Sequence, residues 1–88
     1  MDLKDYRNKL DTIDSEILAL FRERMETVET IAAYKKAYSL PVLSPGREQE
    51  ILDRVRASSS ETLAPYAAQL FETLMSLSRE YQKTMMDD

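Results

Sequence analysis

The sequence predicts an all-α fold of three helices, the first of them very long, because of its composition, its apolar spacing and its few helix breakers. The 88 residues contain one glycine and three prolines, and they are rich in helix-forming Leu, Ala, Glu, Lys, Arg and Met. Strands would require more Val, Ile and Thr in alternation with polar residues. The length fits one domain over residues 1–88. A chain of this size buries only about 60–65% of its unfolded surface, so an isolated monomer would be marginally stable.

The first predicted helix covers residues 2–38 and contains neither glycine nor proline. At 1.5 Å per residue it would be ~55 Å long, whereas a compact domain of this length has a radius of gyration of about 12 Å. We expect a continuous helix whose far half packs on another subunit; the alternative is a bend near residue 22. Apolar residues spaced alternately by three and four predict one buried face, made of Leu3, Tyr6, Leu10, Ile13, Ile17 and Leu20 and continued through Arg24, Thr27, Ile31, Tyr34 and Tyr38.

Two further helices are predicted over residues 45–57 and 64–86. Ser44 can act as an N-cap before Pro45, because the fixed φ of proline suits the first helical position, and Pro65 suits the start of the third helix. The serines at 58–60 are expected to be turn and cap residues rather than a phosphorylation cluster. The inner faces are predicted to contain Ile51, Leu52 and Val55 in the second helix, and Tyr66, Leu70, Phe71, Leu74, Leu77, Ser78, Tyr81 and Met85 in the third.

The composition excludes several classes of function. The chain has no histidine and no cysteine, which removes the usual general base near neutral pH, the thiol nucleophile and most transition-metal sites. Its net charge of −4 argues against a nucleic-acid or anionic-membrane partner. No apolar run approaches the ~20 residues that span a bilayer. We therefore expect no metal, no nucleic acid and no membrane, and a cytoplasmic protein.

Cations lie on the apolar side of the helical pattern, where an unpaired charge is costly. Arg24 and Lys35 are eleven positions apart, which returns to within ~20° of the same direction on a helix. Arg47 and Glu48 fall in the first turn of the second helix, where backbone N–H groups point toward an acceptor. These residue types predict a site that holds a small polyanion.

Ser78 and Gln82 are four residues apart in the third helix, hence adjacent on one face, although both are poor core residues. Singly, each polar residue has an ordinary explanation, such as snorkelling, a local ion pair or a solvated surface. Together on inner faces, they favour the anion site. Arg7 is ~25 Å along the helix from Arg24, so it is either a surface residue or part of a site built mainly by a different subunit.

With these spacings the chain resembles, over nearly its whole length, the all-helical chorismate mutases of the AroQ type, including mutase domains fused to prephenate dehydratases. That resemblance implies an intertwined homodimer with two sites, each completed by Arg7 of the other chain. It has two departures: Ser44 stands where some members have Asp, and Arg79 stands where an apolar residue would help to wall the pocket. The matching motifs are Arg7, Leu10-Asp11-Thr12-Ile13-Asp14, Arg24, Lys35, the pair Arg47-Glu48, and Ser78 with Gln82.

The resemblance implies a chorismate mutase, an isomerase of the shikimate pathway that converts dianionic chorismate into prephenate for phenylalanine and tyrosine biosynthesis. This Claisen rearrangement needs no cofactor, no nucleophile and no proton transfer. The implied catalytic residues are Lys35 and Gln82, which donate to the breaking ether oxygen, with Arg24 and Glu48. The implied substrate contacts are Arg7 and Arg24 to the carboxylates, Glu48 to the hydroxyl with Ser44 nearby, Arg47 and Ser78 in support of a carboxylate, and Ile31, Ile51 and Met75 as apolar walls.

Two other functions stay open at this point. An isochorismate pyruvate-lyase would use the same helices and cations. A non-catalytic helical dimerisation module would instead pair its cations across an interface. Ser78 and Gln82 argue against the module, because an interface seam would prefer Leu and Ala at those positions.

Overall fold

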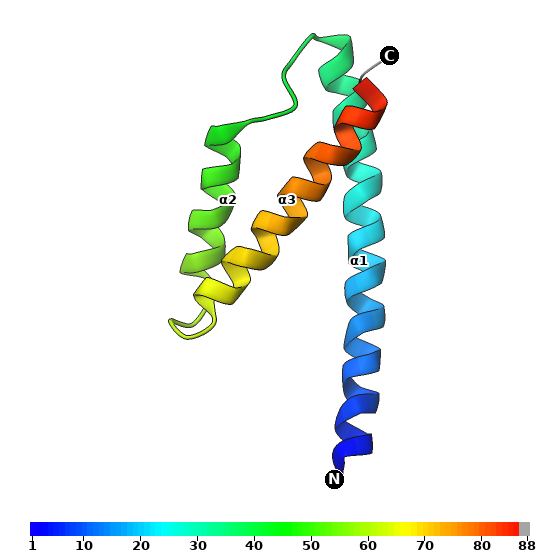
Figure 1. Ribbon diagram of the computed structural model, residues 1–88, viewed down its shortest axis with the longest axis vertical. Helices are drawn as coiled ribbons and strands as arrows, with labels where there is room; N and C mark the ends of the chain where they lie inside the picture. The colour runs from blue at the N-terminus through cyan, green and yellow to red at the C-terminus, as the bar shows by residue number, and fades with distance from the viewer. Residues whose placement is uncertain (87–88) are drawn as a thin grey trace.

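The computed structural model describes residues 1–86, which form three helices and no strand: α1 (Leu3–Ala37), α2 (Pro45–Ala57) and α3 (Ala64–Met86). The predicted all-α class is confirmed, and α1 is continuous rather than bent near residue 22. α3 packs against both other helices and crosses the upper half of α1 (Figure 1). No helix in the described part of the chain is long and apolar enough to span a bilayer.

Both ends of α1 have local causes. Asp2 accepts a hydrogen bond from the Asp5 backbone N–H at 3.0 Å, and the Asp5 carboxylate accepts one from the Asp2 N–H at 3.2 Å, which forms a capping box. At the other end Ser39 takes a left-handed conformation with φ of 54°, and the Leu40 N–H donates to the Lys35 carbonyl at 2.8 Å. Pro41 follows, which disfavours helix at Leu40. The helix therefore stops where the connector to α2 has to turn back.

The serines at the two ends of α2 have different roles. Ser44 is the N-cap of α2, but its side chain makes no capping hydrogen bond, so its hydroxyl stays available to the space between the helices. The Ser59 hydroxyl donates to the Val55 carbonyl at 2.6 Å, and Ser60 Oγ accepts from the Leu63 N–H at 3.2 Å before α3. The prediction that serines 58–60 serve the turn is confirmed.

The core of the protomer is small. Its buried apolar residues are Val28, Ala32, Ala68 and Met75. The predicted inner faces are only partly covered, because α2 has α3 alone to pack on and the first half of α3 extends away from α1 (Figure 1). Among the residues predicted to be buried, Ile51, Leu52 and Val55 are half-buried, and Tyr66, Leu70 and Leu77 are exposed.

A hydrogen bond between Tyr81 and Glu29 is one of the polar contacts that join α3 to α1. The Tyr81 hydroxyl donates to the Glu29 carboxylate. This hydrogen bond is the main cause that raises the pKa of Tyr81 above its ordinary value, and burial and the charge of Glu29 act in the same direction. The link lies at the end of the molecule where the two helices cross.

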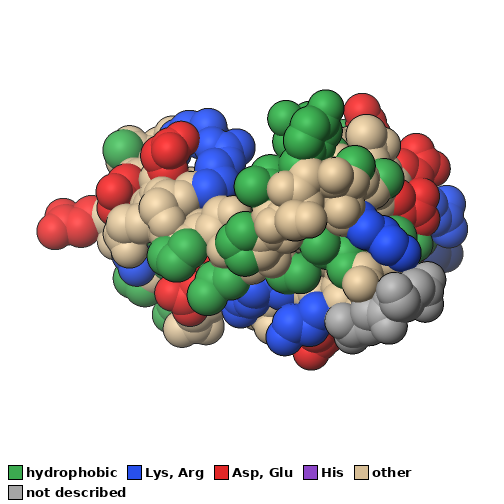
Figure 2. Space-filling view, turned by 90° about the horizontal axis from the view of Figure 1, so that it is seen from above, with side chains coloured by type: hydrophobic (Ala, Val, Ile, Leu, Met, Phe, Trp, Pro, Cys, Tyr) green, Lys and Arg blue, Asp and Glu red, His purple; other side chains and the backbone are tan. Residues whose placement is uncertain are grey.

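The first half of α1 extends beyond the rest of the chain (Figure 1). The molecule measures 54 × 26 × 14 Å and has a radius of gyration of 16.2 Å, well above the value of about 12 Å for a compact domain. The face predicted to be buried there is not buried within the chain: Leu3, Tyr6, Leu10, Ile13, Ile17 and Leu20 are 40–64% exposed. Hydrophobic side chains also reach the surface at the opposite end, between charges of both signs (Figure 2).

The crossing of α1 and α3 should be sensitive to side-chain volume. Ala32 is 1% exposed, so Ala32→Leu should lower the free energy of unfolding by about 1–3 kcal/mol through overpacking. Ala33→Leu adds the same volume at an exposed neighbour and should have little effect. Urea unfolding at one fixed protein concentration measures both. Equal effects of the two substitutions would contradict this packing.

Candidate anion-binding site

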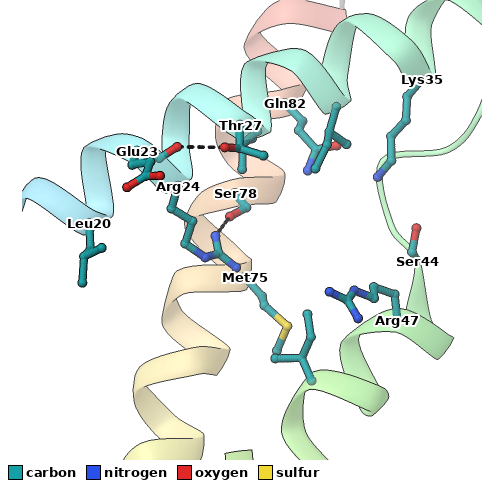
Figure 3. A pocket seen from close by; sticks show the side chains of 13 residues that line it. Leu20, Glu23, Arg24, Thr27, Lys35, Ser44, Arg47, Met75, Ser78 and Gln82 are labelled. Carbon is teal, nitrogen blue, oxygen red and sulfur yellow. Dashed lines mark hydrogen bonds between the residues drawn. The ribbon is translucent and has the colours of Figure 1, made fainter. Parts of the chain in front are cut away.

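A cavity of about 570 Å³ lies between the three helices, within the usual range for small-molecule sites. All three helices and the N-cap of α2 contribute to it, so its shape depends on the whole fold. Figure 3 shows the side chains that point into it from α1, α2 and α3. The lining residues are Leu20, Glu23, Arg24, Thr27, Val28, Ile31, Lys35, Ser44, Arg47, Ile51, Met75, Ser78 and Gln82.

This cavity brings together nine of the residues proposed from the sequence, namely Arg24, Lys35, Ser44, Arg47, Ser78, Gln82, Ile31, Ile51 and Met75. Arg7 and Glu48 are not among the lining residues. Sequence reasoning did not propose Leu20, Glu23, Thr27 or Val28 for the site. Helical spacing could have found three of these, because Leu20, Thr27 and Val28 are three or four residues from Arg24, hence on its face of α1.

Arg24 is held by neutral groups. Its Nη1 donates to Ser78 Oγ and, at 3.5 Å, to the Leu74 carbonyl. The Ser78 hydroxyl donates in turn to the Leu74 carbonyl at 2.8 Å, which leaves its oxygen free to accept from Arg24 (Figure 3). The guanidinium is therefore fixed in orientation without being neutralised.

Lys35 enters the cavity from the last turn of α1. Its Nζ donates to the Val42 carbonyl at 2.7 Å, so this contact also fixes the connector that leads into α2. Arg47 faces the same space from α2 (Figure 3). It pairs with Glu50 at 3.0 Å, but both side chains are more than half exposed, and such surface pairs contribute little stability.

The charges on the lining residues are unequal. Three cations face a single carboxylate, Glu23, and no ion pair among residues 1–86 joins Arg24 or Lys35 to a carboxylate. Partly buried positive charge favours an anionic ligand, because the low local dielectric strengthens the attraction. Within the same residues, no group of His, Cys, Asp and Glu has the arrangement of a metal site.

Gln82 provides a second, independent indication of a ligand. Its side chain is 6% exposed, and Oε1 has no hydrogen-bond partner among the described residues. A buried amide oxygen without a partner typically costs about 1–3 kcal/mol. An apolar residue would avoid that cost, so packing alone does not explain a polar amide at this position.

Glu48 and Arg79 form an ion pair between α2 and α3. Arg79 Nη1 lies 2.6 Å from both carboxylate oxygens of Glu48, and their side chains are 31% and 25% exposed. Arg79 therefore does not turn outward from the molecule. It binds the one carboxylate that the sequence proposed for the site.

Arg7 lies on the exposed first half of α1, seventeen residues before Arg24 and so ~25 Å from it along the helix. The two arginines do not share a site within one chain. This is the geometry expected from the sequence.

The sequence profile described as "Chorismate mutase type II" matches residues 6–83, which is most of the chain and includes every polar residue of the cavity. The chain belongs to the type II chorismate mutase family. The resemblance inferred from the residues is thereby confirmed.

Three curated proteins illustrate the similarity. The chorismate mutase of Methanocaldococcus jannaschii is 30% identical over 98% of this chain and 89% of its own length. The bifunctional chorismate mutase/prephenate dehydratase of Aquifex aeolicus is 34% identical over 90% of this chain, which spans only 21% of that protein. The 4-amino-4-deoxychorismate mutase of Streptomyces venezuelae is 34% identical over 60% of this chain and 52% of its own length. No solved structure gives a significant match.

The buried Gln82 Oε1, which has no hydrogen-bond partner among the described residues, should lower the free energy of unfolding. Gln82→Met keeps the length of the side chain but removes the buried polar atom, so it should raise the free energy of unfolding by about 1–3 kcal/mol. Gln69→Met, at an exposed position of the same helix, is the matched control and should change stability by less than about 0.5 kcal/mol. Urea unfolding of both variants at equal concentration measures the difference. A Gln82→Met protein less stable than the wild type would show that the amide has a structural partner.

Proposed function

We propose that this chain is a chorismate mutase, which converts chorismate into prephenate by an intramolecular Claisen rearrangement. The observation that carries the proposal is the cavity itself: Arg24 and Lys35 without carboxylate partners, beside the buried amide of Gln82. Family membership and the similar chorismate mutase of Methanocaldococcus jannaschii support it. The substrate is a small dianion, which matches the charge of the cavity.

The inventory of residues suits a reaction that transfers no proton. In the rearrangement one C–O bond breaks while one C–C bond forms within the same molecule, so neither a nucleophile nor a cofactor is required. The protein has two tasks: to hold a compact conformer of the substrate, and to stabilise negative charge that grows on the ether oxygen. We propose that donors fixed in orientation by the fold, such as Arg24 and Lys35, meet both needs.

Each polar residue has a proposed role. Arg24 binds a substrate carboxylate with its planar fork, supported by Ser78, and Arg47 supports a carboxylate from α2. Lys35 and Gln82 donate to the ether oxygen. The fixed guanidinium of Arg24 and the closely held Lys35 support this assignment, because donors that are already oriented need no reorganisation during the reaction.

Glu48 and Ser44 are proposed to contact the substrate hydroxyl. Ser44 lines the cavity and has no capping bond to compete for its side chain. Glu48 lies one helical turn further along α2, so the two residues share a face. Ile31, Ile51 and Met75 are proposed as the apolar walls that exclude water.

The direct test is a steady-state assay with chorismate. The ultraviolet absorbance of chorismate should disappear, and prephenate should be identified as the product. Isochorismate is assayed in parallel with pyruvate as the readout, since release of pyruvate would favour the lyase instead. A protein that consumes neither compound would leave the dimerisation module as the better description.

The active form is proposed to be an intertwined homodimer. The exposed apolar face of α1 is continuous with a second, largely apolar cavity of about 520 Å³ between α1 and α3, lined in part by Ile17, Leu70 and Phe71. Leu20 and Arg24 line both cavities. A helix of a second copy that covered this face would therefore approach Arg24, which supports the proposal that Arg7 of the second copy completes the site.

Replacement of Gln82 by glutamate should make the reaction dependent on acid pH. Glutamine donates its N–H at any pH, whereas a glutamic acid donates only when protonated and otherwise places negative charge against the developing oxyanion. Activity of Gln82→Glu should be low near neutral pH and rise as pH falls toward the ordinary pKa of glutamic acid, about 4.3. The measurement is kcat/KM against pH for both proteins. A flat profile for the variant would remove Gln82 from its proposed role.

Two inactive variants should complement each other in a dimer. Arg7→Ala and Arg24→Ala should each be nearly inactive alone, whereas a mixed dimer contains one intact site, which joins Arg24 of one chain to Arg7 of the other. Random pairing gives about half mixed dimers, so the refolded mixture should approach about one quarter of wild-type activity for independent sites.

The controls are each variant refolded alone and light scattering of the wild type, which should show a dimer. Mixed dimers are detected by a mass tag on one variant. If mixed dimers form without regaining activity, Arg7 does not act in the other chain's site. A folded monomer of 10.2 kDa at micromolar concentration would contradict the dimer itself.

A further inference from the structure

Neither Glu48 nor Arg79 lines the cavity, but each member of this ion pair is flanked on its own helix by residues that do. On α2, Glu48 is four residues after Ser44 and three before Ile51, and both of these line the cavity. On α3, Arg79 is four residues after Met75 and three before Gln82, which line it too. Residues at these spacings share one face of a helix, so each member of the pair lies on the stripe that faces the cavity.

Arg79 holds the carboxylate of Glu48 in a fixed position. One nitrogen of Arg79 lies 2.6 Å from both oxygens of Glu48, and about a quarter to a third of each side chain is exposed. The contact fixes the carboxylate and offsets its negative charge. Without Arg79, Glu48 would be an unpaired carboxylate beside the cavity.

We propose that Arg79 determines specificity: it neutralises Glu48, so that the site accepts a substrate with a neutral hydroxyl at this position and rejects one with an ammonium group. The inference rests on the proposed function and on the proposed contact between Glu48 and the substrate hydroxyl. Arg79 acts through Glu48 and is a positioning residue, not a catalytic one.

The physical reason is a difference in charge between two otherwise similar ligands. A carboxylate shared with Arg79 still has lone pairs that accept a hydrogen bond from a hydroxyl. An ammonium group at the same place meets the guanidinium of Arg79 as well as the carboxylate, and like charges at close range cost binding energy. Arg24, Lys35 and Arg47 add to the same repulsion.

The experiment compares kcat/KM for chorismate and for 4-amino-4-deoxychorismate, which has an ammonium in place of the hydroxyl. Arg79→Gln removes the positive charge but keeps a polar side chain, and Arg79→Lys keeps the charge. The preference of the wild type for chorismate should fall by about tenfold or more in Arg79→Gln and be largely retained in Arg79→Lys. Arg79→Met, which removes both charge and donor, should also lose the preference and serves as a second neutral variant should Arg79→Gln fold poorly.

Arg56→Gln is the matched control. It removes one positive charge from the last turn of α2, where Arg56 is exposed, and about 13 Å along the helix from Arg47. The ratio of kcat/KM for chorismate to kcat/KM for 4-amino-4-deoxychorismate should be the same in Arg56→Gln as in the wild type. A purely structural role for Arg79 would lower both rates together and leave their ratio unchanged.

The outcomes separate the two proposals. A wild-type protein inactive on chorismate would overturn the proposed function, and this inference with it. A wild type active on chorismate whose preference is the same in Arg79→Gln, Arg79→Met and Arg79→Lys would overturn the inference alone. Loss of the preference in Arg79→Lys equal to that in Arg79→Gln would also overturn it, because charge would then not be the cause.

Discussion

The positive charge of Arg24 is the constraint around which the site is arranged. A partly buried guanidinium normally requires a carboxylate, but this one is held by the Ser78 hydroxyl and the Leu74 carbonyl. These neutral acceptors satisfy its hydrogen bonds and leave its charge unbalanced. Ser78 can accept because its own proton is engaged by Leu74. The arrangement keeps the cation oriented and available, which a salt bridge within the chain would not.

The polar residues that line the cavity reduce the stability that the core can provide. Gln82 and Ser78 occupy buried positions on α3 where apolar residues would pack better, and only four apolar residues among 1–86 are buried. A chain of this length has little stability in reserve. The exposed apolar face of α1 is therefore more than a surface feature, since covering it with a second chain would add the burial that the protomer lacks. Binding of an anion would stabilise the fold in the same way, by mass action.

Local rules predicted the helices well. Proline and serine predicted the boundaries around α2 from their own backbone preferences, and helical spacing predicted that Arg24 faces the same way as Lys35 and Ser78 the same way as Gln82. Arg24, Lys35, Ser78 and Gln82 all line one cavity, as their predicted positions on the helix faces require. Periodicity reports which face is apolar but not what covers it. This is why the face from Leu3 to Leu20 was predicted as buried and is exposed in the protomer.

The contact between Glu48 and Arg79 could not be read from the sequence, because it joins residues 31 positions apart on different helices. Arg79 stood out only as a charge where an apolar wall was expected. Once α2 and α3 are packed, that charge has a partner, and the local balance of the cavity changes. Glu48 no longer offsets Arg24 or Lys35, since its charge is taken by Arg79. Among the lining residues the three cations therefore still outnumber the single carboxylate, Glu23, which favours a ligand that supplies negative charge.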